Sequence, residues 1–170
     1  MLQVFFAVVA LVAASIHLGV SAKRRSGAAA IVGTYLIYLL LIYVGLMGLF
    51  TAYYHVFRPV EASASIGWAT SPYEYEVGMA DLTVGVLGVL CLVFRGEFWL
   101  ATAIADAVWL LGDAVGHIRE TVVHNNHAEN NAGIFLVFEI VMPILILGLV
   151  LYHRHLTLEG TSYSRDGRSA

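Results

Sequence analysis

Charge is scarce in this sequence. Only 12% of its 170 residues are Asp, Glu, Lys or Arg, whereas soluble domains have about 25%. At the same time 59% of the residues are hydrophobic, and the mean hydropathy is +0.80. This composition excludes a water-soluble globular protein. It predicts a membrane protein whose main partner is the lipid bilayer.

Cysteine, basic patches and repeats are also missing. The single cysteine, Cys91, excludes an intrachain disulfide and a multi-cysteine metal site. The formal net charge of −3 and the lack of a basic stripe argue against a nucleic-acid partner. No segment recurs at a fixed period, which excludes solenoid architectures.

Long apolar runs are what the chain does contain, and five of them reach the length of about 17–25 residues that a membrane-spanning helix needs. We therefore predict an all-α, polytopic integral membrane bundle of five transmembrane helices, with a single domain over residues 1–156. The polar remainder, 157–170, is predicted to be a disordered tail. The predicted spans are Leu2–Val20, Ala28–Tyr53, Tyr73–Phe94, Phe98–Thr121 and Ile134–Tyr152.

The basic residues predict an orientation. Lys23, Arg24 and Arg25 follow the first span, Arg95 follows the third and Arg154 follows the fifth, so all lie on one side of the membrane. The positive-inside rule then places the amino terminus outside and the carboxyl terminus in the cytoplasm of a multi-pass cell-membrane protein. A signal peptide is disfavoured because the positive charges follow the first apolar run instead of preceding it.

Six carboxylates interrupt the apolar pattern, and His117 lies among them. A charged side chain in hydrocarbon costs at least about 2.5–3.5 kcal/mol, so such residues need protons, cations or partners and are candidates for function. The six are Glu76, Asp81, Asp106, Asp113, Glu120 and Glu139.

Helical geometry groups the ionisable side chains of the fourth span. They are spaced by seven, four and three residues, so at about 100° per residue they lie within roughly 60° on one face. Gly112 and Gly116 in this span predict the close approach of a neighbouring helix. The polar face consists of Asp106, Asp113, His117 and Glu120.

The third and fifth spans add carboxylates from other directions. Asp81 shares a helix face with three glycines, which predicts that it faces the bundle, whereas Glu76 projects about 140° away from it. Glu139 lies about two turns inside the fifth span. The glycines on the Asp81 face are Gly78, Gly85 and Gly88.

Together these residues predict a metal site in the external half of the membrane. Oxygen ligands with one imidazole suit Fe, Mn or Zn, and helix bundles hold such ions between inward-facing Glu and His side chains. We predict a metalloprotein with one or two ions, acting as an oxidoreductase or hydrolase if it is catalytic. The predicted metal ligands are Asp81, Asp113, His117, Glu139, Glu76 and Asp106, and Glu76 and Glu120 are candidate proton shuttles.

Other uses of the acidic cluster stay open. The carboxylates could share protons in a structural polar core, or carry protons or divalent cations as a transporter or channel. The sequence has no inverted repeat in its hydropathy, so a carrier would need its second half from a homodimer. Haem ligation by His17, His55 or His117 is a third option, although His17 and His117 lie on opposite sides.

A series of short motifs runs through the three carboxy-terminal spans. In these motifs the chain resembles a family of small, uncharacterised multi-pass membrane proteins of bacteria and archaea. The resemblance implies no activity, but it supports the choice of site residues. The motifs are Gly67-Trp68, Ser71-Pro72, Glu76-Val77-Gly78, Gly116-His117-Ile118, Asn131-Ala132-Gly133, and Glu139 before Pro143.

Overall fold

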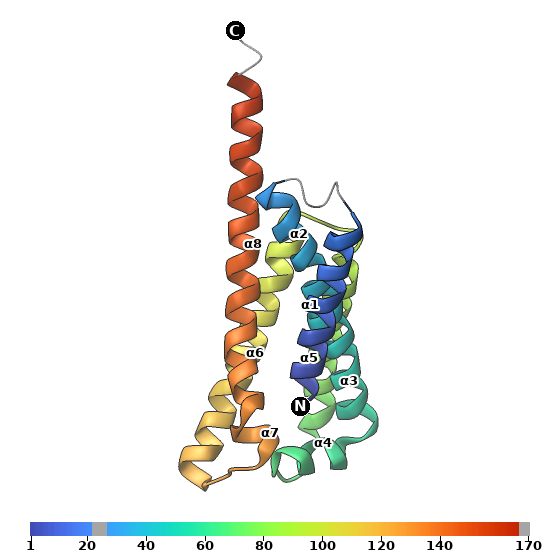
Figure 1. Cartoon of the computed structure of the whole chain (residues 1–170). Coiled ribbons are helices and arrows are strands. Elements are labelled where there is room, and N and C mark those ends of the chain that lie inside the picture. Colours follow the sequence, from blue (N-terminus) through green and yellow to red (C-terminus); the bar gives the residue numbers. More distant parts are fainter. Residues whose placement is uncertain (22–26, 167–170) are drawn as a thin grey trace.

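The computed structural model describes residues 1–21 and 27–166, with side chains up to residue 158, and every regular element in this part is a helix. The long helices run up and down along one axis (Figure 1). The all-α prediction is therefore confirmed for the described residues. In order, the elements are α1 (Leu2–Val20), α2 (Ala28–Tyr38), η2 (Leu39–Leu46), α3 (Met47–Phe57), α4 (Pro59–Ile66), α5 (Tyr73–Leu90), α6 (Glu97–His124), α7 (Glu129–Ala132) and α8 (Ile134–Asp166).

Four stretches of the described chain are long and apolar enough to cross a membrane, which fits the predicted membrane protein. α5 is 18 residues long but carries Glu74, Glu76 and Asp81, and it is not one of the four. Its role as a fifth span stays a prediction. The four stretches are Leu2–Val20, Ala28–Phe57, Glu97–His124 and Glu129–Leu158.

α8 is longer than the sequence predicts. It continues through Pro143 and past the expected end at Tyr152 to Asp166, so it enters the segment 157–170. Residues 167–170 of that segment lie outside the described residues, as do the basic residues Lys23, Arg24 and Arg25.

Close backbone packing joins α5 to the long helix formed by α2, η2 and α3. A Cβ atom added at Gly85 would lie 2.7 Å from the backbone nitrogen of Leu49, and one added at Gly88 would lie 2.5 Å from that of Gly45. Only glycine allows two helices to approach this closely. The prediction that this side of α5 faces the bundle is confirmed, and Asp81, one turn before Gly85, is buried.

The long helix changes its winding at mid-length. Between α2 and α3, residues Leu39–Leu46 form a π-helical segment, η2, in which hydrogen bonds run from residue i to i+5. Fully buried core side chains such as Leu40, Tyr43 and Ile146 come from η2 and α8. The widened turn therefore lies in the best-packed part of the molecule.

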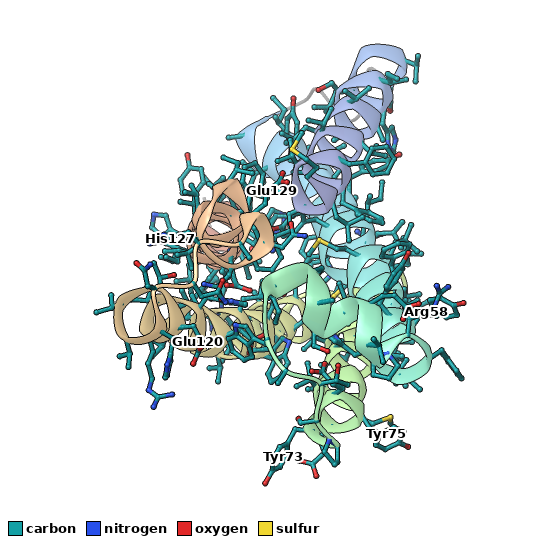
Figure 2. The ribbon with its side chains drawn as sticks, turned by 90° about the horizontal axis from the view of Figure 1, so that it is seen from below. Arg58, Tyr73, Tyr75, Glu120, His127 and Glu129 are labelled. Atoms are coloured by element: carbon teal, nitrogen blue, oxygen red, sulfur yellow. The ribbon has the colours of Figure 1, made fainter. Side chains whose placement is uncertain are left out.

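α4 and α7 lie together at the end of the bundle opposite the carboxyl-terminal end of α8, and we call this the α4–α7 end (Figure 1). α4 stops at Gly67, whose φ of 73° is in the left-handed region that glycine adopts readily. The Asn126 Nδ2 group donates to the Ile66 carbonyl (2.8 Å), which ties the α6–α7 connection to α4. Figure 2 looks onto this end, where Tyr73 and Tyr75 point away from the bundle.

Candidate functional site

A cavity of about 220 Å³ lies inside the bundle towards the α4–α7 end. Its walls come from α1, the long helix, α4, α5, α6 and α8, so six helical segments contribute residues to it. We call it the acidic cavity. Five of the six predicted metal ligands line it, together with two further ionisable residues: Asp81, Asp106, Asp113, His117 and Glu139, with His55 and Glu74.

The two candidate proton shuttles lie elsewhere. Glu76 is exposed on the side of α5 that the 140° offset from Asp81 predicts. Glu120 is half-buried, with its Oε1 3.8 Å from Arg119 Nη1 and 3.7 Å from His124 Nε2. Neither carboxylate is among the residues that line the acidic cavity.

Gly112 and Gly116 also line the cavity, and the prediction that they let a helix approach closely is wrong. A Cβ atom added at Gly112 would meet no described atom within 4 Å, and one at Gly116 would meet only the Trp68 ring, at 3.6 Å. These glycines open space beside α6 instead of closing it. The spacing of these glycines does not distinguish close helix packing from an open cavity, because both need a residue without a side chain.

Asp81 and His55 form the first of two histidine–carboxylate pairs in the cavity. Asp81 Oδ2 lies 2.7 Å from His55 Nδ1, and Asp81 Oδ1 accepts a hydrogen bond from Trp109 Nε1 at 2.9 Å. Both carboxylate oxygens therefore have protein partners. We call this the closed pair.

His117 and Glu139 form the second pair, and its geometry differs. His117 Nε2 lies 3.8 Å from Glu139 Oε1, which is too far for a hydrogen bond. Both residues are buried, with 6% and 2% of their surface exposed. We call this the open pair.

Several buried oxygen atoms at this cavity lack a hydrogen-bond partner within the described part of the chain. They are Glu139 Oε2, Asp106 Oδ2 and Gln3 Oε1, and all three residues line the cavity. Buried polar atoms are nearly always satisfied, so orphaned ones indicate a bound water or ion. The open pair is thus part of a larger unsatisfied polar surface.

Asn131 of α7 is a hydrogen-bond hub beside the open pair. Its Oδ1 lies 2.9 Å from His117 Nδ1 and accepts from Trp68 Nε1 at 2.9 Å. Its Nδ2 lies near three oxygens: Thr121 Oγ1, the Asn126 carbonyl and the His117 carbonyl. Asn131 is fully buried. The α4–α7 end is therefore fastened directly to the histidine of the site.

The sequence predicts most of the carboxylates of the site and His117, but not the side chains that surround them. The sequence suggests for His55 only haem ligation, and it indicates no role for Trp109 or Gln3. Asn131 had a signal in the sequence, since it lies in the Asn131-Ala132-Gly133 motif. His55 had a weaker one: it is a polar residue near the end of a long apolar helix.

In the described residues, no three His, Cys, Asp or Glu side chains come together as a complete ligand set for one ion. A second cavity, of about 300 Å³, lies near the start of α2 and is lined by Arg95, Trp99 and His153. The Trp99 and His153 rings are tilted by 40° with centroids 5.5 Å apart, and Arg95 Cζ lies over the Trp99 ring, 5.3 Å from its centroid. None of the described residues that line this cavity is a carboxylate.

In the described residues, the fold and the site together define an all-α bundle that has four helices long and apolar enough to cross a membrane and a buried carboxylate–histidine cavity. The chain belongs to a family of unknown function, DUF6790, whose model matches residues 1–159. The match covers almost the whole chain, beyond the three carboxy-terminal spans that carry the motifs. No curated protein and no solved structure matches it.

Proposed function

We propose that this is a multi-pass protein of the cell membrane in which α5 is the fifth span, with the amino terminus outside and the carboxyl terminus in the cytoplasm. The packing of α5 supports this, since α5 lies against η2 and α3 and turns Asp81 into the acidic cavity. Arg95 and Arg154 lie away from the α4–α7 end, as the positive-inside rule requires for a cytoplasmic side.

Within that membrane domain, we propose a metal centre at the open pair. The distance between His117 Nε2 and Glu139 Oε1 carries this proposal. Protein nitrogen and oxygen ligands lie at about 2.0–2.2 Å from an ion such as zinc, so two ligands of one ion are at most about 4.4 Å apart. The observed 3.8 Å is inside that limit and beyond hydrogen-bond length.

Further ligands would have to come from other groups of the same cavity, since the described residues bring no third His, Cys, Asp or Glu together with the open pair. In the described part of the chain, Glu139 Oε2 and Asp106 Oδ2 are buried without a hydrogen-bond partner, and Asp113 lines the same cavity. A set of carboxylates with one imidazole suits Fe, Mn or Zn. A bound ion would supply Lewis-acid or redox chemistry, or activate a water, as an oxidoreductase or a hydrolase requires.

Metal analysis of the full chain purified in detergent tests this proposal. We expect roughly one Zn²⁺ per chain after equilibration and desalting, and a loss of at least about tenfold in Glu139→Gln and His117→Ala, because each removes a ligand. Glu76→Gln is the matched control, since it makes the same chemical change on an exposed carboxylate. Equal zinc in the wild type and both site variants would overturn the metal centre.

The alternative is a transporter of protons or divalent cations that uses the same residues. One observation favours it: buried polar groups continue from the acidic cavity towards the second cavity. Asp106 is followed one turn away by fully buried Thr102, whose Oγ1 lies 3.5 Å from Cys91 Sγ. Flux of Zn²⁺ or protons into liposomes containing the wild type, lost in Asp106→Asn, would support transport over a fixed centre.

A further inference from the structure

We infer that Asn131 is a positioning residue: it holds the proton of His117 on Nδ1 and so leaves the Nε2 lone pair facing Glu139. The claim about the proton stands on hydrogen bonds alone. Its value for metal binding rests on the function proposed above.

The orientation of the Asn131 amide follows from its neighbours. The indole Nε1–H of Trp68 can only donate, so the atom 2.9 Å from it must be the oxygen of the amide. On the other side, the Thr121 hydroxyl already donates to the His117 carbonyl (2.9 Å), so its oxygen must accept from Asn131 Nδ2. A flipped amide would place donor against donor and oxygen against carbonyl oxygen.

The proton on His117 follows from that orientation. Asn131 Oδ1 is an acceptor only, and it lies 2.9 Å from His117 Nδ1. If Nδ1 were bare, two lone pairs would face each other in a fully buried setting, which is costly. Nδ1 must therefore carry the proton, and in the neutral imidazole Nε2 is then the unprotonated nitrogen.

The orientation of the unprotonated His117 Nε2 is also fixed. The His117 ring is held between Trp68 and Phe135, with ring centroids 5.3 and 5.4 Å away. Nε2 is thereby directed at Glu139 Oε1, 3.8 Å away. A histidine that binds a metal commonly donates its other N–H to a carbonyl oxygen in this way, which fixes its tautomer and orientation.

Nitrogen NMR of the metal-free full chain in detergent tests the assignment, using ¹⁵N-labelled histidine. In mildly alkaline buffer, we expect His117 to show a protonated Nδ1 and a bare Nε2. The wild-type spectrum needs no variant, so it decides the question even if a variant fails to fold. A His117 signal with the proton on Nε2 would overturn the inference.

Two asparagine variants then separate positioning from general stability. Asn131→Ala should release the tautomer preference and weaken Zn²⁺ binding by about 10–100-fold, the loss typical of removing such a partner. Asn130→Ala, at the neighbouring half-buried position of α7, should leave both unchanged. An Asn131→Ala protein that folds with the wild-type tautomer and zinc affinity would also overturn the inference.

The two proposals fail in different ways. A wild-type chain with the proton on Nδ1 that binds no Zn²⁺ would contradict the metal centre and support the role of Asn131 in setting the tautomer. A chain that binds Zn²⁺ but carries the proton on Nε2 when metal-free would contradict the role of Asn131 and support the metal centre.

Discussion

The two histidine–carboxylate pairs of the acidic cavity have the same chemical components and opposite states. In the closed pair, His55 and Trp109 occupy both oxygens of Asp81. In the open pair, His117 stands 3.8 Å from Glu139, whose second oxygen has no partner in the described part of the chain. One pair is satisfied by protein groups, and the other is left to be satisfied by something else.

This difference separates structure from function within a single cavity. A satisfied buried carboxylate contributes to stability, because removing it would leave buried donors without an acceptor. An unsatisfied one lowers stability, and functional sites are where such a cost is expected. The closed pair thus accounts for part of the packing of α3 on α5, and the open pair is where we propose that the chemistry takes place.

The largest expected difference in stability is between the variants that make Asp81 and Glu139 neutral in metal-free protein. Asp81→Asn should lower the free energy of unfolding by about 2–3 kcal/mol. The amide keeps only one acceptor oxygen, so one of the half-buried groups His55 and Trp109 loses its hydrogen bond and the other loses the charge of its acceptor. Glu139→Gln should stay within about 0.5 kcal/mol of the wild type or exceed it, because a neutral amide costs less to bury than an unpaired charge. Denaturant unfolding in detergent micelles measures both.

A reversed order, with Glu139→Gln the more damaging variant without metal, would contradict the assignment of closed and open pairs. His55→Phe is a useful companion to Asp81→Asn. It removes the other half of the closed pair, so the two changes should be clearly non-additive in a double variant.

A smaller contrast is expected from two glycines that flank the pairs. Gly85→Ala, one turn from Asp81, should destabilise the fold by about 1–3 kcal/mol, because its Cβ would lie 2.7 Å from the Leu49 nitrogen. Gly112→Ala, beside the open pair, should be neutral or stabilising by up to about 1 kcal/mol, since open space surrounds it and alanine favours the helix. Thermal unfolding of the two variants under matched conditions checks this, and equal losses would contradict the packing described here.

The smallest effects are expected outside the cavity. Glu76→Gln and Glu120→Gln should change stability by less than about 0.5 kcal/mol, since Glu76 is exposed and the surface ion pairs of Glu120 contribute little. Zinc affinity, measured by titration, should remain close to the wild-type value. A large loss of zinc affinity in either variant would show that the substituted carboxylate is part of the metal site.

Sequence reasoning reached the inward polar face but not its partners. Asp106, Asp113 and His117 share one face because helical periodicity is a local property, and that property can be read from spacing. The glycines near Asp81 in the sequence predict that it faces inward, and they too are a local signal. The prediction of four of the long apolar helices rests on the same kind of signal.

The pairing of side chains could not be obtained in this way. Whether Asp81 contacts His55 depends on how α3 and α5 pack, and that is decided by contacts far apart in the sequence. The misread Gly112 and Gly116 show the same limit, since a missing side chain permits contact on one helix and a cavity on another. The role of Asn131 depends on α7, a four-residue helix too short for a periodic signal.

The π-helical segment Leu39–Leu46 acts as a phase shift in the long helix. A π turn accommodates an extra residue, so the part of the helix beyond it is rotated relative to a regular α-helix. If the same residues were wound as a regular α-helix instead, α3 would be turned by about 100° for each extra residue that the π segment accommodates. That rotation would carry His55 away from Asp81, so the closed pair depends on the π winding some ten positions before it.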